Sequence, residues 1–549
     1  MFQDLFRFDY LSIFVGIAVV VFSLLIAFYS ISYMSKRKGL GRYYSCIFLT
    51  LLASLGTVFA NNLILFMVFW GFLGLLLYLL IGFGEKKHTS ATAKKAFIII
   101  GGTDAVMLLG LALVWQLSGS MLIDKINIPF DSKAAVGAYL CLAIGAFAKA
   151  GAMPFHTWVP DTAEDAPSPV TAYLPASLDK LLGIYFLTRI SLDMFEMNAS
   201  MNNILMVVGS VTIVAAVMMA LVQHDLKKLL GYHAVSQVGY MVLGIGTGTP
   251  VGIAGGIFHM LNHAIYKSCL FLSGGSVERR AGTTDLERLG GFSKIMPITF
   301  VSFLVASFAI SGVPPFNGFA SKWLIYQGII ETAKGGGYLW IVWLIAAMFG
   351  SSLTLASFMK LIHTVFLGQP SLESKKKYKK RDEIQPTMWI PPAILAFLCI
   401  IFGIFALQIP LRLFIFPSLE MQVQMSGMWS ASLATFLIFI GMIIGFIIYF
   451  IANISKTRET DIFIGGEFPE KQPEMRISGT QFYNTVSDIG LLKRIYRLAE
   501  MKMFDIYDVC MKITFGFNKV LSYLHNGVLS TYLAWCLLGT LVLFFIIIR

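Results

Sequence analysis

Charged residues are scarce in this chain. Asp, Glu, Lys and Arg together make up 13% of its 549 residues, whereas a soluble protein of this length carries about a quarter. Hydrophobic residues make up 57%, and long apolar runs recur from end to end. Runs of about 20 apolar residues are long enough to cross a lipid bilayer. The composition therefore predicts an all-α integral membrane protein and excludes a soluble globular one.

Cysteine is also sparse, and its arrangement argues against the common cofactor sites. The six cysteines are scattered and form no CxxC pair or Cys/His cluster, so we expect no disulfide framework and no iron–sulfur or zinc site. The sequence also lacks a phosphate-binding loop, a GxGxxG fingerprint and a nucleophile–base arrangement. We therefore expect no cofactor, no bound metal and no catalytic chemistry within this chain.

Fourteen apolar runs fit membrane-spanning helices, because lipid requires each segment to satisfy its own backbone hydrogen bonds. They cover approximately residues 11–33, 44–59, 61–83, 96–117, 134–160, 171–191, 204–223, 228–247, 252–277, 296–332, 339–367, 387–410, 430–452 and 530–548.

Basic residues explain the net charge of +12 without a nucleic-acid partner. They cluster in the short loops that follow odd-numbered spans, while the opposite loops carry few. Since basic loops stay in the cytoplasm, this asymmetry predicts both termini on the non-cytoplasmic side. One loop departs from the pattern, because residues 160–170 carry acidic side chains and no lysine.

Two long spans are interrupted by proline and glycine. The fifth reads GAFAKAGAMPFHTWVPD around Lys149, and the tenth reads AISGVPPFNGFASKW before Lys322. Proline blocks the helical hydrogen-bond ladder, and irregular backbone at membrane depth survives only inside protein or beside a wet cavity. Two breaks, five spans apart, predict two five-helix repeats that are inverted relative to each other. Kinked structural helices are the alternative.

The predicted spans and repeats divide the chain into five parts. These are an N-terminal helix (1–43), two halves that each contain one of the repeats (44–191 and 204–367), two further spans (368–452) and a C-terminal region (453–549). The C-terminal region is expected to contain a cytoplasmic loop, a lateral helix and a terminal membrane anchor. From about 492 to 524, apolar residues recur every three or four positions with charges between them. That pattern predicts one amphipathic helix, too charged to span the membrane.

Charged residues inside the spans are the candidate functional residues, because a charge at membrane depth costs at least ~2.5 kcal/mol and usually faces the bundle interior. Lys149 lies inside the fifth span. His259, His263 and Lys267 are spaced four residues apart in the ninth span and form one stripe. Histidine titrates near neutral pH, so the stripe suits proton relay. Hydrogen-bonded structural histidines and a zinc-like pair stay open as alternatives.

Asp179 and Lys180 are adjacent, about midway along the sixth span. Neighbouring residues on a helix point about 100° apart, so each is expected to have its partner on another helix. For Asp179 we expect that partner to be Lys149. Asp104, in the fourth span, is the rival carboxylate.

Lys360 and His363 are also candidates, near the cytoplasmic end of the eleventh span. Long cationic side chains near a span end commonly reach to the membrane surface. We favour this snorkelling interpretation for both residues over a role in ion translocation.

Several segments resemble the antiporter-like subunits of respiratory complex I, namely FRFDYLSIFVG, KKAFIIIGGTDA, GAFAKAGAMPFHTWVPDTAEDAPSPV, HDLKKLLGYHAVSQVGYM, FHMLNHAIYKSCLFLSGGSV and SGVPPFNGFASK. The same family includes group 4 membrane-bound hydrogenases and Mrp-type cation/proton antiporters. The similarity runs from about residue 6 to 370. The lateral helix and final span resemble the distal complex I subunit and its hydrogenase homologues. The resemblance implies a polar axis at the membrane midplane, lined by Lys149, His259, His263, Lys267 and Lys322.

The sequence departs from the family pattern in the first half. Many relatives read Trp-Glu where this chain reads Trp70-Gly71, so the glutamate usually paired with the first-half lysine is absent. Many relatives also carry a histidine where this chain has Pro175, and the Asp179-Lys180 pair is unfamiliar. We therefore expect the first-half channel to conduct differently or not at all.

Together these observations predict an ion-pumping subunit of a complex I-like or group 4 hydrogenase-like oxidoreductase in a prokaryotic cytoplasmic membrane. Its expected partners are other membrane subunits, the transported H⁺ or Na⁺ and, indirectly, peripheral iron–sulfur, flavin or hydrogenase-like subunits. Two alternatives stay open. One is a subunit of a stand-alone Na⁺/H⁺ antiporter, and the other is a structural subunit that conducts nothing.

Overall fold

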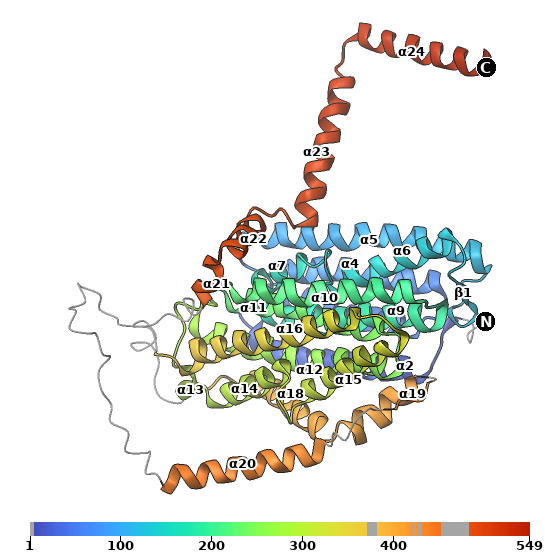
Figure 1. Ribbon diagram of the computed structural model, residues 1–549. Helices are drawn as coiled ribbons and strands as arrows, with labels where there is room; N and C mark the ends of the chain where they lie inside the picture. The colour runs from blue at the N-terminus through green and yellow to red at the C-terminus, as the bar shows by residue number, and fades with distance from the viewer. Residues whose placement is uncertain (1–4, 370–381, 420, 425–430, 452–482, 549) are drawn as a thin grey trace. The chain divides into compact units, whose positions relative to one another are not determined.

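The computed structural model describes residues 5–369, 382–419, 421–424, 431–451 and 483–548. Within these ranges the chain is almost entirely helical, and the two strands there, β1 (Ile128–Pro129) and β2 (Phe195–Glu196), pair in parallel. The chain divides into two compact units, Met1–Asp488 and Ile489–Arg549. Figure 1 shows the helices of each unit.

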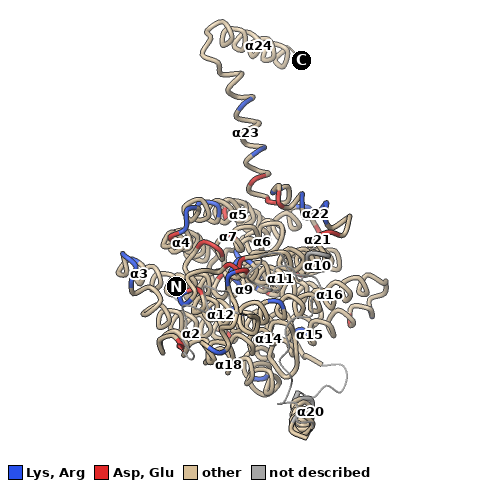
Figure 2. Tube along the Cα trace, turned by 90° about the vertical axis from the view of Figure 1, so that its left-hand side faces the viewer, with Lys and Arg blue, Asp and Glu red and all other residues tan. Residues whose placement is uncertain are grey.

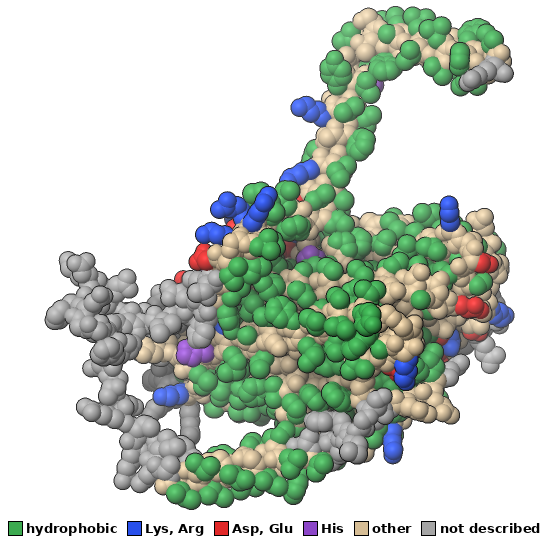
Figure 3. All heavy atoms as spheres, viewed as in Figure 1, with side chains coloured by type: hydrophobic (Ala, Val, Ile, Leu, Met, Phe, Trp, Pro, Cys, Tyr) green, Lys and Arg blue, Asp and Glu red, His purple; other side chains and the backbone are tan. Residues whose placement is uncertain are grey.

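Nine helices of the described residues are long and apolar enough to cross a membrane. They are α2 (Tyr10–Tyr33), α3 (Leu40–Phe59), α4 (Leu63–Ile81), α5 (Thr89–Ser118), α6 (Lys133–Ala150), α10 (Ala199–Leu221), α16 (Leu339–Leu361) with its extension to Leu367, α18 (Pro386–Ile404) and α24 (Leu529–Ile548). Hydrophobic side chains cover the face of the first unit over α10 and α16 (Figure 3). The chain is therefore a multi-pass membrane protein.

The other helices complete the described part of the chain. In the first unit they are α7 (Trp158–Asp165), α8 (Ser168–Tyr173), α9 (Asp179–Arg189), α11 (Leu226–Gly246), α12 (Pro250–Ala281), α13 (Phe292–Ile295), α14 (Pro297–Ser311), α15 (Asn317–Glu331), α19 (Phe416–Ser418), α20 (Ala431–Ile451) and α21 (Asn484–Asp488).

Helix α12 is the central helix of the first unit. It packs against α8, α9, α11, α14, α15 and α18, and every residue from Val251 to Val277 is buried. Because protein surrounds it on all sides, α12 can carry polar side chains that a lipid-facing helix could not.

The two predicted helix breaks are present, and they share one geometry. Helix α6 ends before Gly151 and α14 ends before Gly312, and both glycines have a φ of +78°. Residues with a side chain rarely adopt this conformation. In both breaks the amide after the glycine donates to the carbonyl four residues before the glycine, at 2.8 Å and 3.1 Å. These bonds close each helix in a Schellman motif.

The sixth predicted span is not a regular helix. Between α8 and α9 the segment Leu174–Leu178 is π-helical, and it contains Pro175. A π-helical turn shifts the register of the residues that follow and is frequent at functional sites. Apolar composition alone predicts the length of this span and cannot reveal the π-helical turn.

The lateral helix predicted over 492–524 is two helices, and the prediction of one continuous helix was wrong. Helix α22 (Gly490–Glu500) ends before Lys502, which has a φ of +56°. Helix α23 (Ile506–Leu524) begins after Asp505, whose carboxylate accepts from the Tyr507 amide at 3.0 Å. An aspartate at this position starts a new helix, although the apolar spacing continues across the gap. Most of the predicted cytoplasmic loop lies outside the described residues.

Candidate functional site

The seven strongest sequence candidates are all buried in the first unit. They are Lys149 on α6, Asp179 and Lys180 on α9, His259, His263 and Lys267 on α12, and Lys322 on α15. None is more than 2% exposed. A snorkelling lysine would expose its amine, so burial argues against that alternative for the lysines of this set.

Lys149 is held by Trp70 rather than by a residue at position 71. Its ammonium donates to the Trp70 carbonyl at 3.3 Å and lies 5.0 Å from the centre of the Trp70 ring. The Trp70 ring nitrogen donates to Asp104 Oδ1 at 2.8 Å. Trp70 therefore links the lysine of α6 to a carboxylate on α5. Gly71 is exposed, and a Cβ added there would meet open space.

Asp179 lies within electrostatic range of two ammonium groups, those of Lys149 and Lys180. Lys149 is in turn within range of both Asp179 and Asp104. The Asp179 atom Oδ2 has no hydrogen-bond partner among the described residues. A buried carboxylate with an unused oxygen between two amines can exchange a proton with either one.

Lys180 packs against the first helix break. Its ammonium lies 5.6 Å from the centre of the Trp158 ring, and it approaches to 2.9 Å the position that a Cβ on Gly151 would occupy. Any side chain at position 151 would therefore displace the amine. Lys180 also interacts electrostatically with Lys267 and His263 on α12. Lys180 therefore connects the candidate residues of the first half electrostatically with those of the second.

Lys267 and His263 carry unused proton-binding atoms. In the described part of the chain, neither the Lys267 amine nor either ring nitrogen of His263 has a hydrogen-bond partner. The Lys267 ammonium lies over the rings of Phe271 and Phe358, at 5.7 and 5.6 Å from their centres. The Ala176 carbonyl, in the π-helical segment, lies beside His263 without hydrogen-bond geometry. Buried polar groups normally require a partner, so this region suits mobile protons or water.

His259 is fully engaged by its neighbours. Its Nδ1 is hydrogen-bonded to Ser321 Oγ at 2.9 Å, and its Nε2 lies 3.1 Å from Gln237 Oε1 and 3.2 Å from the Tyr266 hydroxyl. Both ring nitrogens are thereby committed to side-chain partners. This arrangement favours a hydrogen-bonded relay over metal ligation.

Lys322 uses the second helix break. Its ammonium donates at 2.9 Å to the Ile310 carbonyl, which lies just before the break, and sits 4.7 Å from the centre of the Tyr240 ring. Where a helix ends, its last carbonyls lose the amide donors that the next turn would supply. The end of α14 therefore provides the acceptor for Lys322.

Sequence reasoning missed two members of this polar set, His233 and Gln237 on α11. His233 Nε2 is hydrogen-bonded to Ser357 Oγ at 2.7 Å, and the ring interacts electrostatically with Lys267 and Lys322. Gln237 contacts His259 as described above. The two are four residues apart, on one helical face. The four-residue spacing of these two polar residues, in a span otherwise interpreted as apolar, is the sequence feature that could have identified them.

Lys360 does not snorkel, which corrects the sequence interpretation. It is 1% exposed and donates to the carbonyls of Leu221 and Gln223, at 2.9 and 3.0 Å. It thus binds the carbonyl of the last residue of α10 and a second carbonyl just beyond that helix. His363 is exposed, so the two residues do not share one environment. The π-helical segment Ile362–Leu367 begins between them and changes the register of the helix.

The acidic loop that departed from the charge pattern is neutralised by lysines of neighbouring helices. Lys95 on α5 pairs with Asp161 at 2.8 Å, and Lys228 on α11 pairs with Glu164 at 2.8 Å. Asp161 and Glu164 lie on α7, so the segment expected as a loop is partly helical and these two acids are paired within the helix bundle.

A second ionic cluster lies at the end of α12. Glu278 accepts hydrogen bonds from Tyr33 at 2.8 Å and from Ser168 at 2.7 Å, and its other oxygen lies 3.4 Å from the Lys227 ammonium. Lys227 also donates to the Ala166 carbonyl at 2.7 Å. These bonds connect α2, α8, α11 and α12, and we assign the cluster a structural role.

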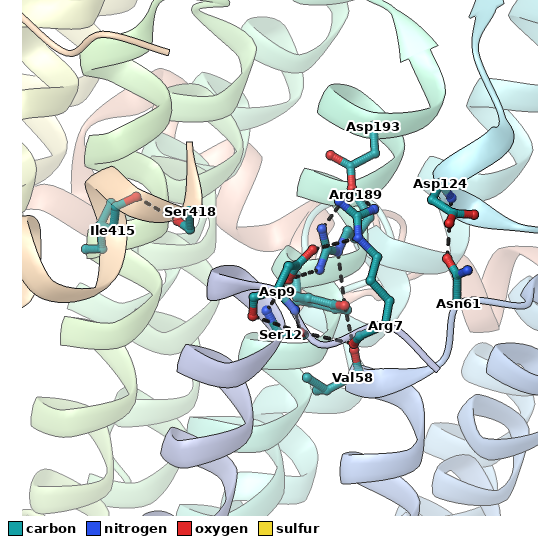
Figure 4. A network of polar contacts seen from close by, with 11 residues as sticks. Arg7, Asp9, Ser12, Val58, Asn61, Asp124, Arg189, Asp193, Ile415 and Ser418 are labelled. Carbon is teal, nitrogen blue, oxygen red and sulfur yellow. Dashed lines mark hydrogen bonds and ion pairs between the residues drawn. The ribbon is translucent and has the colours of Figure 1, made fainter. Parts of the chain in front are cut away.

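A third cluster fixes the N-terminal segment (Figure 4). Arg7 pairs with Asp9 and Asp193, each at 2.8 Å, and Arg189 pairs with Asp9 at 2.7 Å and with Asp193 at 2.8 Å. Arg189 ends α9, whose first residues are Asp179 and Lys180. The FDYLS segment thereby anchors the helix that carries the central charge pair.

Family models match two regions of the chain. The model described as NADH:quinone oxidoreductase/Mrp antiporter, TM, matches residues 60–354. The model described as NADH-ubiquinone oxidoreductase (complex I), chain 5 N-terminus, matches residues 5–44.

Curated relatives match over part of their length. The Na⁺/H⁺ antiporter subunit A1 of Staphylococcus saprophyticus is 33% identical over an alignment of 403 residues, and the match covers 69% of this chain and 50% of the relative. The subunit A1 of Staphylococcus haemolyticus is 32% identical over 421 residues, 72% of this chain and 52% of the relative. The chain thus spans about half the length of these relatives.

Two solved structures share the fold. A chain of the archaeal membrane-bound sulfane sulfur reductase, a respiratory membrane complex, has a TM-score of 0.82 at 24% identity, covering 97% of this chain and 88% of that one. A chain of the Mrp complex from Dietzia sp. has a TM-score of 0.69 at 22% identity, covering 75% of this chain and 83% of that one.

Proposed function

This chain belongs to the NADH:quinone oxidoreductase/Mrp antiporter family, and from that membership we propose that it is an ion-translocating subunit of a larger membrane complex. The observation that carries the proposal is the line of buried titratable residues from Asp104 to Lys322. It passes through Lys149, Asp179, Lys180, Lys267, His263 and His259 without leaving the interior. Burying so many ionisable groups at membrane depth is costly, and such groups usually mark an ion pathway.

Lys180 is the proposed switch between the halves. Two neighbouring ammonium groups in a low-dielectric interior repel each other, so a proton arriving at Lys180 favours release from Lys267. Asp179 determines where the proton on Lys180 comes from, because its carboxylate interacts electrostatically with both Lys149 and Lys180. In this chain Asp179, together with Asp104, takes the place of the glutamate that many relatives carry at position 71. The first half is thereby proposed to conduct.

The proposed topology has fourteen spans in two inverted halves, with both termini on the non-cytoplasmic side. The matching closures at Gly151 and Gly312 support two related halves. The pairing of the acidic loop with Lys95 and Lys228 supports the orientation, because it removes the one exception to the charge pattern.

We propose a redox-driven complex of the complex I or group 4 hydrogenase type as the host. The whole-length fold similarity to a respiratory complex supports it, since that match covers 97% of this chain. A gradient-driven Mrp-type antiporter is the second candidate, favoured by the similarity to antiporter A subunits over 69% of this chain.

Purification of the tagged chain from its native membrane tests both the proposed ion translocation and the proposed redox-driven host complex. We expect co-purifying membrane subunits, together with iron–sulfur, flavin or hydrogenase-like proteins, and proton or sodium movement after reconstitution into liposomes. Companion subunits without any redox protein would favour the antiporter. Absence of both proton and sodium movement, in the isolated chain and in every reconstituted complex that contains it, would refute ion translocation.

A further inference from the structure

A polar pocket lies at the junction of α3, α4 and α5, outside the ion pathway described above. It has a volume of about 400 Å³. Its lining includes Arg42 from the start of α3, Lys86 and Lys87 from the loop between α4 and α5, and Thr89 and Ser90 from the start of α5. Figure 2 shows Lys and Arg residues at the start of α3 and near α4 and α5.

The pocket is strongly cationic. Arg42, Lys86 and Lys87 line it, and none of the described residues in the lining is acidic. Arg42 is placed by the Phe83 ring, whose centre lies 5.3 Å from the guanidinium carbon. The nearest acid in the loop sequence, Glu85, is 72% exposed and faces Arg37 at 3.7 Å. Asp225 is within electrostatic range of Lys86 but does not line the pocket. The charged residues of the lining itself are therefore all positive.

Unused hydrogen-bond donors face the same space. No side chain caps the start of α5, a helix of 30 residues. The Thr89 amide donates to the Lys86 carbonyl at 3.1 Å, whereas the next amides of a helix have no partner within it. The Thr89 hydroxyl is a second, independent signal. Thr89 is 5% exposed, it lines the pocket, and its hydroxyl has no hydrogen-bond partner among the described residues. An uncapped helix start with a free hydroxyl and adjacent basic residues suits a phosphate group.

We propose that this pocket binds a phosphate group, supplied by the headgroup of an anionic phospholipid. The lipid source follows from the rest of the lining, because Tyr78, Leu79 and Ala93 belong to the membrane-spanning helices α4 and α5. A headgroup at the basic end of the pocket would leave its acyl chains along these helices. Basic pockets between helices on the cytoplasmic side are suited to such lipids.

Lipid binding to the purified full chain tests the proposal. Nanodiscs with equal amounts of phosphatidylglycerol and phosphatidylcholine provide the lipids, and native mass spectrometry counts those retained. We expect retained phosphatidylglycerol in the wild type and at least about tenfold weaker retention in the triple variant Arg42→Gln, Lys86→Gln, Lys87→Gln. Thr89→Val, which removes the hydroxyl and keeps the shape, should weaken retention by a smaller factor.

The matched control removes the same charge outside the pocket. Lys36, Lys38 and Lys94 are exposed, do not line the pocket and lie in or beside the same two loops, so Lys36→Gln, Lys38→Gln, Lys94→Gln should retain the lipid as the wild type does. Equal loss in both triple variants would overturn the site, since it would show only general attraction to anionic lipid. Absence of phosphatidylglycerol from the wild type would also overturn it. Displacement of the lipid by millimolar inorganic phosphate would support a phosphate site while assigning it to a soluble ligand.

Discussion

Lys149 donates a hydrogen bond to the Trp70 carbonyl at 3.3 Å and stacks its ammonium 5.0 Å from the centre of the Trp70 ring. The next residue, Gly71, offers no side chain. Lys149 lies instead within electrostatic range of Asp179 on α9 and of Asp104 on α5. Two carboxylates from different helices therefore act on the lysine at the first helix break.

Replacing Asp179 should affect transport more than replacing Asp104. Asp179 faces two amines and is 1% exposed, whereas Asp104 is 8% exposed and is held by the Trp70 ring nitrogen. An asparagine can neither carry the negative charge nor take up a proton, so we expect Asp179→Asn to lower ion transport by at least about tenfold and Asp104→Asn by less. Transport rates of the reconstituted complex measure this. A larger loss in Asp104→Asn would reverse the assignment of the two carboxylates.

Acid should release the N-terminal anchor. Burial alone would raise the pKa of Asp9, but the hydrogen bond and charge of Arg189 lower it from 3.8 to about 2. A carboxylate with a lowered pKa contributes stability above its unfolded value of 3.8 and loses that contribution as the pH falls toward 2. The difference in thermal stability between wild type and Asp9→Asn should therefore be constant at neutral pH and vanish in strong acid. A difference that persists at the lowest pH would contradict this.

The Glu278 cluster should matter for stability. Glu278→Ala leaves Lys227 without its carboxylate, and the Lys227 side chain is 2% exposed. Stranding a buried charge costs about 3–5 kcal/mol, which thermal unfolding of the purified protein would register as a clear decrease. The control is Glu331→Ala, which removes an exposed pair with Lys334 and should cost at most about 1 kcal/mol. Equal effects of the two substitutions would argue against a structural role for Glu278.

Deleting residues 489–549 should weaken assembly without unfolding the rest. These residues form a compact unit of their own, and α22 and α23 expose large apolar side chains such as Leu491, Phe515 and Phe517. Each large apolar side chain that a neighbouring subunit buries contributes about 1.5 kcal/mol or more. Native gel electrophoresis of the truncated complex should show lost subunits. A complete and fully active complex after the deletion would contradict this role.

The sequence predicts the helix breaks well, because proline and glycine act through local backbone geometry. Gly151 and Gly312 end their helices as their surroundings predict. Burial of Lys149 and Lys267 was also predictable, since an unpaired cation avoids lipid.

Register and long-range packing were not predictable in the same way. Nothing in the apolar pattern reports the π-helical turn at Leu174–Leu178 or the interruption before Asp505. The partners of Lys360 lie at and just beyond the end of α10, far away in sequence. His233 was missed because its role depends on Ser357 of another helix.

Ion transport by variants of the two second-half lysines tests the central claim most directly. Lys267→Ala and Lys322→Ala each remove an amine at membrane depth, and Lys36→Ala removes an exposed one as the control. We expect each buried substitution to abolish coupled proton or sodium transport in the reconstituted complex, with all subunits still assembled and the control fully active. Full ion pumping by a complex that carries both Lys267→Ala and Lys322→Ala would contradict a translocation pathway through these residues.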